Sequence, residues 1–145
     1  MDWFDLPIWD THGQTTLAQA KQRAARSSHG APSHGKILAE LSFGFWRYLV
    51  SKRYLTALWI PVLNNAFPQG ATDIRTRQQE VSSALVTMNF VRNRAAHLEP
   101  VFKRDLQKDL ADAQRLLSWV NTDAASWLTD TNTLTGAMAT RPAKR

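Results

Sequence analysis

Residues 73–100, DIRTRQQEVSSALVTMNFVRNRAAHLEP, decide the expected fold. Apolar residues recur along this stretch at helical spacing, and the main stripe consists of Val81, Ala84, Leu85, Met88, Val91 and Ala95. Asp73 is expected to cap the start of the helix. Pro100 is expected to stop it, because the residue before a proline avoids the helical region. The stretch therefore predicts one long helix from Asp73 to about Leu98.

The rest of the chain also shows helical spacing, and strand-type alternation is absent from the sequence. Residues 1–13 form an expected irregular arm that packs Trp3, Phe4 and Trp9 on the body. Further helices are expected over residues 15–27, 36–52, 54–63 and 105–120, followed by a short helix capped by Asp123, with linkers at 27–35 and 64–72. The prediction is a single all-α domain over residues 1–145, with its core at about 15–128 and a flexible, frayed tail at 129–145.

Composition narrows the classes of partner and compartment. The 145 residues suit one domain, and the net charge of +6 favours anionic partners such as nucleic acid. The chain has no Cys, which excludes disulfides and thiolate metal sites and fits a reducing cytosol. No apolar run reaches the roughly 20 residues of a membrane helix, and the acidic start lacks the pattern of a signal peptide. A cytoplasmic protein without a membrane partner is therefore expected.

Two lines of residues on the long helix point to a site near its end. Arg92 lies within the main apolar stripe, where a guanidinium is costly unless it is paired or faces a wet cleft. On the opposite side Val86, Phe90, Asn93 and His97 follow one another at steps of four, three and four residues. Apolar residues on that side suggest that another helix or a second copy of the chain covers it.

These side chains suit metal-free cleavage of RNA. His97 can take a proton from a ribose 2′-hydroxyl, and Arg92 can stabilise the charge that develops on the phosphate. Asn93 can position either group. Arg92 and His97 lie about 140° apart around an ideal helix, so two copies would have to pool their residues. The simpler alternative is a basic helix end, where the helix dipole favours cations such as Arg94 and His97.

Four segments resemble the Abi-like family of abortive-infection proteins in the HEPN superfamily. They are Leu41–Leu49 (LSFGFWRYL), Leu58-Trp59, Phe67-Pro68 and Val91–Phe102 (VRNRAAHLEPVF), and the resemblance spans roughly residues 36–120. It implies a HEPN-like helical bundle that acts as a homodimeric, metal-independent endoribonuclease without a cofactor. The catalytic residues would then be Arg92, Asn93 and His97, and the biology would be phage defence or a toxin restrained by a protein or RNA antitoxin.

Two departures from that family keep other functions open. Many relatives carry a second His where this chain has Leu98, and the N-terminal part looks short. A non-catalytic HEPN module that binds RNA or a protein is therefore the alternative, and an immunity protein modified by a partner nucleotidyltransferase is a third hypothesis. Arg94 and Glu99 are candidate substrate-binding residues, although they could instead pair with each other.

Other candidate residues are expected to have ordinary roles. His12, His29 and His34 are interpreted as solvated loop residues rather than metal ligands. We interpret three aromatic residues as core rather than as a base-stacking surface: Trp46, Trp59 and Phe45. The charged residues at the starts of two helices are interpreted as solvated: Arg75, Arg77, Lys103, Arg104, Lys108 and Asp109. Phosphate contacts are the alternative for Arg75 and Arg77.

Overall fold

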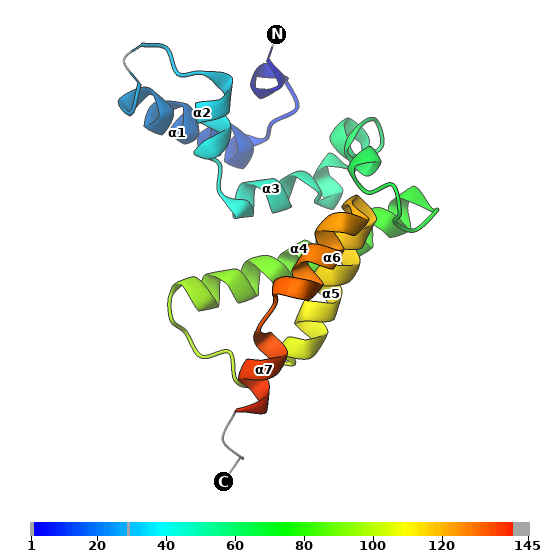
Figure 1. Ribbon diagram of the computed structural model, residues 1–145. Coiled ribbons are helices and arrows are strands. Elements are labelled where there is room, and N and C mark those ends of the chain that lie inside the picture. Colours follow the sequence, from blue (N-terminus) through cyan, green and yellow to red (C-terminus); the bar gives the residue numbers. More distant parts are fainter. Residues whose placement is uncertain (1, 29, 141–145) are drawn as a thin grey trace.

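The computed structural model describes residues 2–28 and 30–140, and this part of the chain contains helices and no strands (Figure 1). The all-α prediction is confirmed. In chain order the elements are η1 (Trp3–Asp5), α1 (Thr11–Arg26), α2 (His34–Ala39), α3 (Phe43–Leu49), η2 (Lys52–Tyr54), η3 (Leu55–Trp59), η4 (Leu63–Ala66), α4 (Ile74–Ala96), α5 (Leu106–Val120), α6 (Thr122–Thr131) and α7 (Leu134–Ala139).

The first of two hydrophobic clusters lies between the N-terminal arm, α1 and α3. Phe4 and Trp9 of the arm are buried against Leu17 and Phe45, and Trp3 lies edge-on to Trp9. The expected packing of the arm on the body is therefore confirmed. Burial of these aromatic rings is a main source of stability, since each removes a large apolar area from water.

The second cluster joins the η2–η4 region to α4 and α5. Its buried members are Val50, Trp59 and Val81, and Leu116 of α5 packs against them. The prediction of core positions is confirmed for Trp59 and Phe45 but is wrong for Trp46, which is 38% exposed. The Trp46 ring borders the first cluster, 6.1 Å from the ring of Trp3, but it lies at the edge of this cluster and is only partly covered.

The single helix expected over residues 36–52 is divided into α2 and α3, so this prediction is wrong. The Ser42 hydroxyl accepts a hydrogen bond from the Phe45 amide and caps a new helix. The helix expected over residues 54–63 is instead a π segment, Leu55–Trp59, followed by turns. The Asn64 side-chain amide donates to the carbonyls of Trp59 and Ile60. These two carbonyls, which directly precede Pro61, therefore have hydrogen-bond partners although the regular helix is interrupted.

The other helix ends differ less from expectation. Asp73 caps α4 as predicted, accepting from the Thr76 amide at 2.7 Å, and Asp105 caps α5. Asn121, and not Asp123, caps α6. The tail expected from residue 129 is helical in part, since α6 runs to Thr131 and α7 follows. Residues 141–145 lie outside the described residues.

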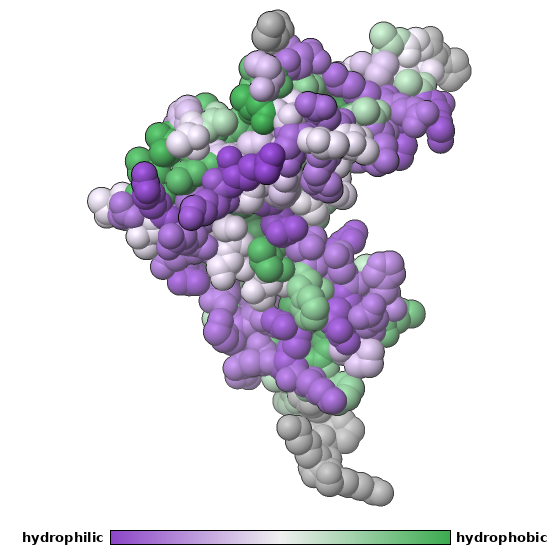
Figure 2. Space-filling view, turned by 180° about the vertical axis from the view of Figure 1, so that it is seen from behind, coloured by the Kyte–Doolittle hydropathy of each residue, from purple (hydrophilic) through white to green (hydrophobic). Residues whose placement is uncertain are grey.

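Surface polarity differs between regions of the molecule. Figure 2 shows hydrophobic surface along one edge, on the side where η3 and η4 lie, whereas most of that face is hydrophilic. Ile60 and Val62 contribute exposed apolar side chains to this region. Among the described residues, no helix combines the length and apolar character needed to cross a bilayer.

Candidate functional site

The C-terminal half of α4 carries the predicted site and extends beyond α5 and α6 (Figure 1). Burial along the apolar stripe falls accordingly, from Val81 and Ala84, which are buried, through the half-buried Met88 and Val91 to the exposed Ala95. Arg92 is exposed. The expected conflict between Arg92 and the core is therefore absent, because the core does not reach this part of the helix.

Arg92 and Asn93 contact each other directly. The Arg92 Nη1 donates to the Asn93 Oδ1 at 3.1 Å, and both side chains are exposed. The oxygen of the Asn93 amide is thus occupied by a guanidinium. Its nitrogen makes no hydrogen bond within the described part of the chain.

His97 follows the last residue of α4. Its backbone amide donates to the Asn93 carbonyl at 3.0 Å, and its side chain is exposed. The imidazole makes no hydrogen bond or ion pair with any described residue. Within one chain nothing joins it to Arg92, which agrees with their expected angular separation on the helix. The structure therefore brings Arg92 and Asn93 together and leaves His97 apart from them.

Arg94 and Glu99 have structural partners. The Arg94 guanidinium donates two hydrogen bonds to the Pro100 carbonyl, at 3.0 and 2.8 Å, and lies 3.4 Å from the Glu99 carboxylate. These contacts fold the loop after α4 back on the helix. The pairing of Glu99 with Arg94, one of the two interpretations from the sequence, is what the structure contains.

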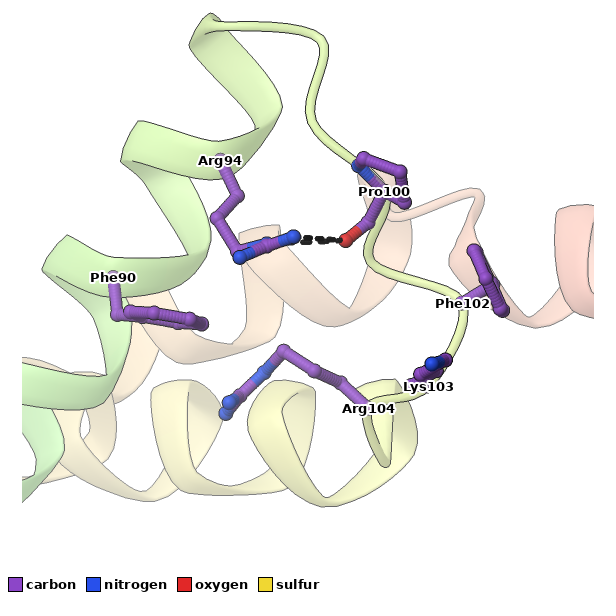
Figure 3. Close-up of a pocket in the computed structure, with 6 residues that line it drawn as sticks. All are labelled: Phe90, Arg94, Pro100, Phe102, Lys103 and Arg104. Atoms are coloured by element: carbon purple, nitrogen blue, oxygen red, sulfur yellow. Dashed lines mark hydrogen bonds between the residues drawn. The ribbon is translucent and has the colours of Figure 1, made fainter.

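A hollow of about 390 Å³ lies beside this loop, lined by Phe90, Arg94, Pro100, Phe102, Lys103 and Arg104. Figure 3 shows the Phe90 ring between the guanidinium groups of Arg94 and Arg104, whose carbons lie 5.4 and 5.0 Å from the ring centre. Such stacking of cations on an aromatic face is attractive.

Arg104 lines this hollow, although it was predicted to be a solvated charge. It forms two hydrogen bonds with the buried Asp109 carboxylate, at 2.8 and 2.7 Å, and these raise the pKa of the Arg104 guanidinium. The prediction of solvated charge is wrong for Asp109, which is buried. No sequence signal distinguished this pair from the neighbouring charges of mixed sign.

A second groove, of about 370 Å³, lies between α3 and α4 and is lined by Arg47, Val86, Asn89, Phe90, Asn93, Arg94 and Glu99. Arg47 belongs to the segment Leu41–Leu49 and was not predicted as a site residue. On this side of α4, Val86 is 46% exposed and Phe90 is 44% exposed. The described chain therefore covers these side chains only in part, with Arg104 against Phe90 and Arg47 of α3 across the groove.

Two of the other histidines lie in helices and not in the loops where they were expected. His12 and His34 lie in α1 and α2 rather than in loops, and His34 contacts the Asp2 carboxylate at 2.9 Å. His29 lies outside the described residues. Within residues 2–28 and 30–140 no group of three or more His, Asp or Glu side chains is arranged to hold a metal ion.

Comparison of the chain with protein-family models, with curated proteins and with solved structures gives no match. The resemblance to the Abi-like family therefore stays a prediction from the sequence segments that carry it.

Proposed function

We propose that the chain is a metal-independent endoribonuclease of the abortive-infection type that acts as a homodimer. The observation that carries this proposal is the exposed His97 imidazole, which is free of partners among the described residues, on the same helix end as the exposed Arg92–Asn93 pair. An imidazole that is open to solvent and free of partners is available for proton transfer. The net charge of +6 favours an RNA substrate.

The reaction needs two proton transfers and stabilisation of charge. One His97 takes the 2′-hydroxyl proton while the 2′-oxygen attacks the adjacent phosphorus, and an imidazolium returns a proton to the departing 5′-oxygen. Arg92 stabilises the developing charge on the phosphate oxygens, and Asn93 holds the Arg92 side chain. The products are a 2′,3′-cyclic phosphate and a 5′-hydroxyl.

A second copy would complete this site. Val86 and Phe90 share a line on α4 with Asn93 and His97, so a copy that covers these apolar side chains would also approach the candidate catalytic residues. Two copies would then supply two imidazoles and two guanidinium groups to one cleft. This arrangement would overcome the divergence of Arg92 and His97 within one chain.

The test is incubation of the protein with total cellular RNA in EDTA, followed by analysis of the cut ends. We expect the wild type to leave cyclic phosphate ends, and Arg92→Ala and His97→Ala to lose activity by about 100-fold or more. His34→Ala is the matched control and should retain full activity, because His34 contacts Asp2 far from this helix end in sequence. Intact RNA with the wild type, or equal cleavage by His97→Ala, would contradict the proposal.

The dimer is tested separately by sedimentation. Val86→Asp places a charge on the exposed apolar face and should yield monomers that do not cleave RNA. An active monomer would exclude the shared site.

A non-catalytic module that binds RNA or a protein partner is the second candidate. It is favoured by the structural use of Arg94 and Glu99 and by the position of Leu98, an apolar residue, directly after His97. In that case His97→Ala would bind RNA like the wild type and neither protein would cut it.

A further inference from the structure

Arg47, a half-buried residue of α3, differs from the half-buried Arg94 and Arg104 because its guanidinium has no partner among the described residues. Its Nε is buried without a hydrogen bond, and none of its nitrogens bonds to or pairs with a described residue. By contrast, Arg94 donates to the Pro100 carbonyl at 2.8 Å and Arg104 to the Asp109 carboxylate at 2.7 Å. A buried N–H group without an acceptor is unfavourable, so the Arg47 Nε calls for an acceptor that the described chain does not supply, and an anion in the groove would provide one.

The groove that Arg47 lines offers further donors. Asn89 makes no hydrogen bond with the described residues, and Asn93 has only its oxygen engaged, by Arg92. The carboxylate in the groove, that of Glu99, lies 3.4 Å from Arg94, whose guanidinium offsets its charge. The groove therefore presents amide N–H groups and one uncompensated positive charge.

We propose that this groove between α3 and α4 binds a phosphate group of the RNA backbone through Arg47, Asn89 and Asn93. The inference rests on the proposed function for the identity of the ligand, whereas the anion site rests on the groove itself. The planar guanidinium matches two oxygens of a phosphate, and the groove of about 370 Å³ is open enough to admit one. Because Asn93 also holds Arg92, the phosphate in the groove lies beside the candidate catalytic pair and fixes the register of the strand.

The first experiment tests the anion site with inorganic phosphate alone. Thermal unfolding is followed in sodium phosphate and in sodium chloride of equal ionic strength. Phosphate should raise the Tm of the wild type and of Arg26→Gln, a control that removes one exposed charge elsewhere, because a ligand that binds only the folded state stabilises it. Arg47→Gln should show no such rise.

A second variant guards against misfolding of Arg47→Gln. Asn89→Asp retains Arg47 and adds a carboxylate to the groove, which should abolish the rise by charge repulsion. An equal rise in Arg47→Gln and the wild type, or no rise in the wild type, would overturn the anion site.

The second experiment measures binding of a short single-stranded RNA by fluorescence anisotropy, with every variant carrying His97→Ala so that the RNA stays intact. Arg47→Gln should weaken binding about tenfold and reduce the slope of log K against log salt by about 0.7, the value for one lost phosphate contact. Arg26→Gln should bind like its parent.

The outcomes separate the two proposals. If the wild type cuts RNA but Arg47→Gln binds it as tightly as Arg26→Gln, the phosphate site is wrong and the nuclease proposal stands. If phosphate stabilises the wild type through Arg47 but RNA is neither bound nor cut, the proposed function is wrong and the anion site stands.

Discussion

Asp10 connects several segments of the chain through one carboxylate. It accepts from the Tyr48 hydroxyl at 2.6 Å, from the Gly13 amide at 2.9 Å and from the Tyr54 hydroxyl at 3.0 Å, and it lies 2.8 Å from Arg53. The Tyr48 hydroxyl is the main cause that lowers the pKa of Asp10 to about 2, followed by the Gly13 amide, with smaller contributions from Tyr54 and Arg53. The ionised carboxylate is therefore part of the folded structure.

This network predicts acid sensitivity that Asp10→Asn removes in part. The pKa of Asp10 is lower in the folded chain than the value of about 3.9 in unfolded peptides, so its contribution to stability is complete above that value. It is lost as the pH falls from about 4 toward 2. Urea unfolding at pH 7, 4 and 2.5 should show a smaller acid loss for Asp10→Asn than for the wild type. Asp123→Asn, a change at an exposed residue, should follow the wild type, and equal losses in all three proteins would contradict the role of Asp10.

Single residues also explain where prediction from the sequence reached its limit. The irregular arm was expected to run to residue 13, but Gly13 lies inside α1, where a Cβ would stand 3.1 Å from the Tyr54 hydroxyl oxygen. The glycine thus allows α1 to pack closely against Tyr54, a residue distant in sequence. Asn121 and Asp123 are both good capping residues, and only the backbone conformation shows that Asn121 caps α6.

At the scale of the element, a strained residue, Leu98, lies two residues after the end of α4. Leu98 has φ 55°, in the left-handed region that favours glycine, and its side chain is 94% exposed. The side chain therefore gains little from packing while its backbone conformation is unfavourable.

Leu98→Gly should consequently stabilise the protein by about 0.5–1 kcal/mol, the difference between the relieved strain and the greater freedom of glycine in the unfolded chain. The measurement is the free energy of unfolding in urea. Leu98→Ala removes the same apolar side chain but retains the strain, so it should not gain this stability. If both variants gained equally, relief of the backbone strain would not be the cause.

The long helices were the most predictable elements. Asp73 and Asp105 were expected at the starts of α4 and α5, where they cap, because a capping residue there precedes a sustained apolar period. The break between α2 and α3 was missed because buried Leu41 and Phe45 continue the helical spacing across the capping Ser42. Periodicity reports which residues face a core, and it does so even where the backbone changes direction.

At the scale of the whole molecule, burial is concentrated in the N-terminal part and the first half of α4. The described residues of α6 and α7 include none that is buried, and Trp127 of α6 is 66% exposed. The C-terminal helices therefore depend on a shallow contact with the rest of the chain.

Hydrogen exchange should reflect this distribution. Peptides from α1 and from the first half of α4 should exchange at least tenfold more slowly than peptides from α6 and α7, because local opening is less costly where few apolar contacts are lost. Mass spectrometry at two protein concentrations provides the measurement. Equal protection of α1 and α6 at the lower concentration would show that shallow burial does not govern local opening here.

The sequence identified the residues of the candidate site but not the side chains that surround them. Arg92, Asn93 and His97 lie on the exposed end of α4, and the sequence alone supplied their spacing. Arg104 reaches Phe90 only because the loop returns, and Arg47 reaches the groove only because α3 lies beside α4. Both contacts arise from tertiary packing, which no local pattern encodes.

The position of the α3–α4 groove has a mechanical consequence. Its Arg47 wall belongs to α3, which is anchored in the first hydrophobic cluster through Phe45, whereas its asparagine wall belongs to α4, which is anchored in the second through Val81. The Gln78 side-chain amide of α4 also donates a hydrogen bond to the carbonyl of Val50, the residue that follows α3. An anion bound by residues of both helices would link the two hydrophobic clusters, so the whole molecule would be more rigid when the groove is occupied than when it is empty.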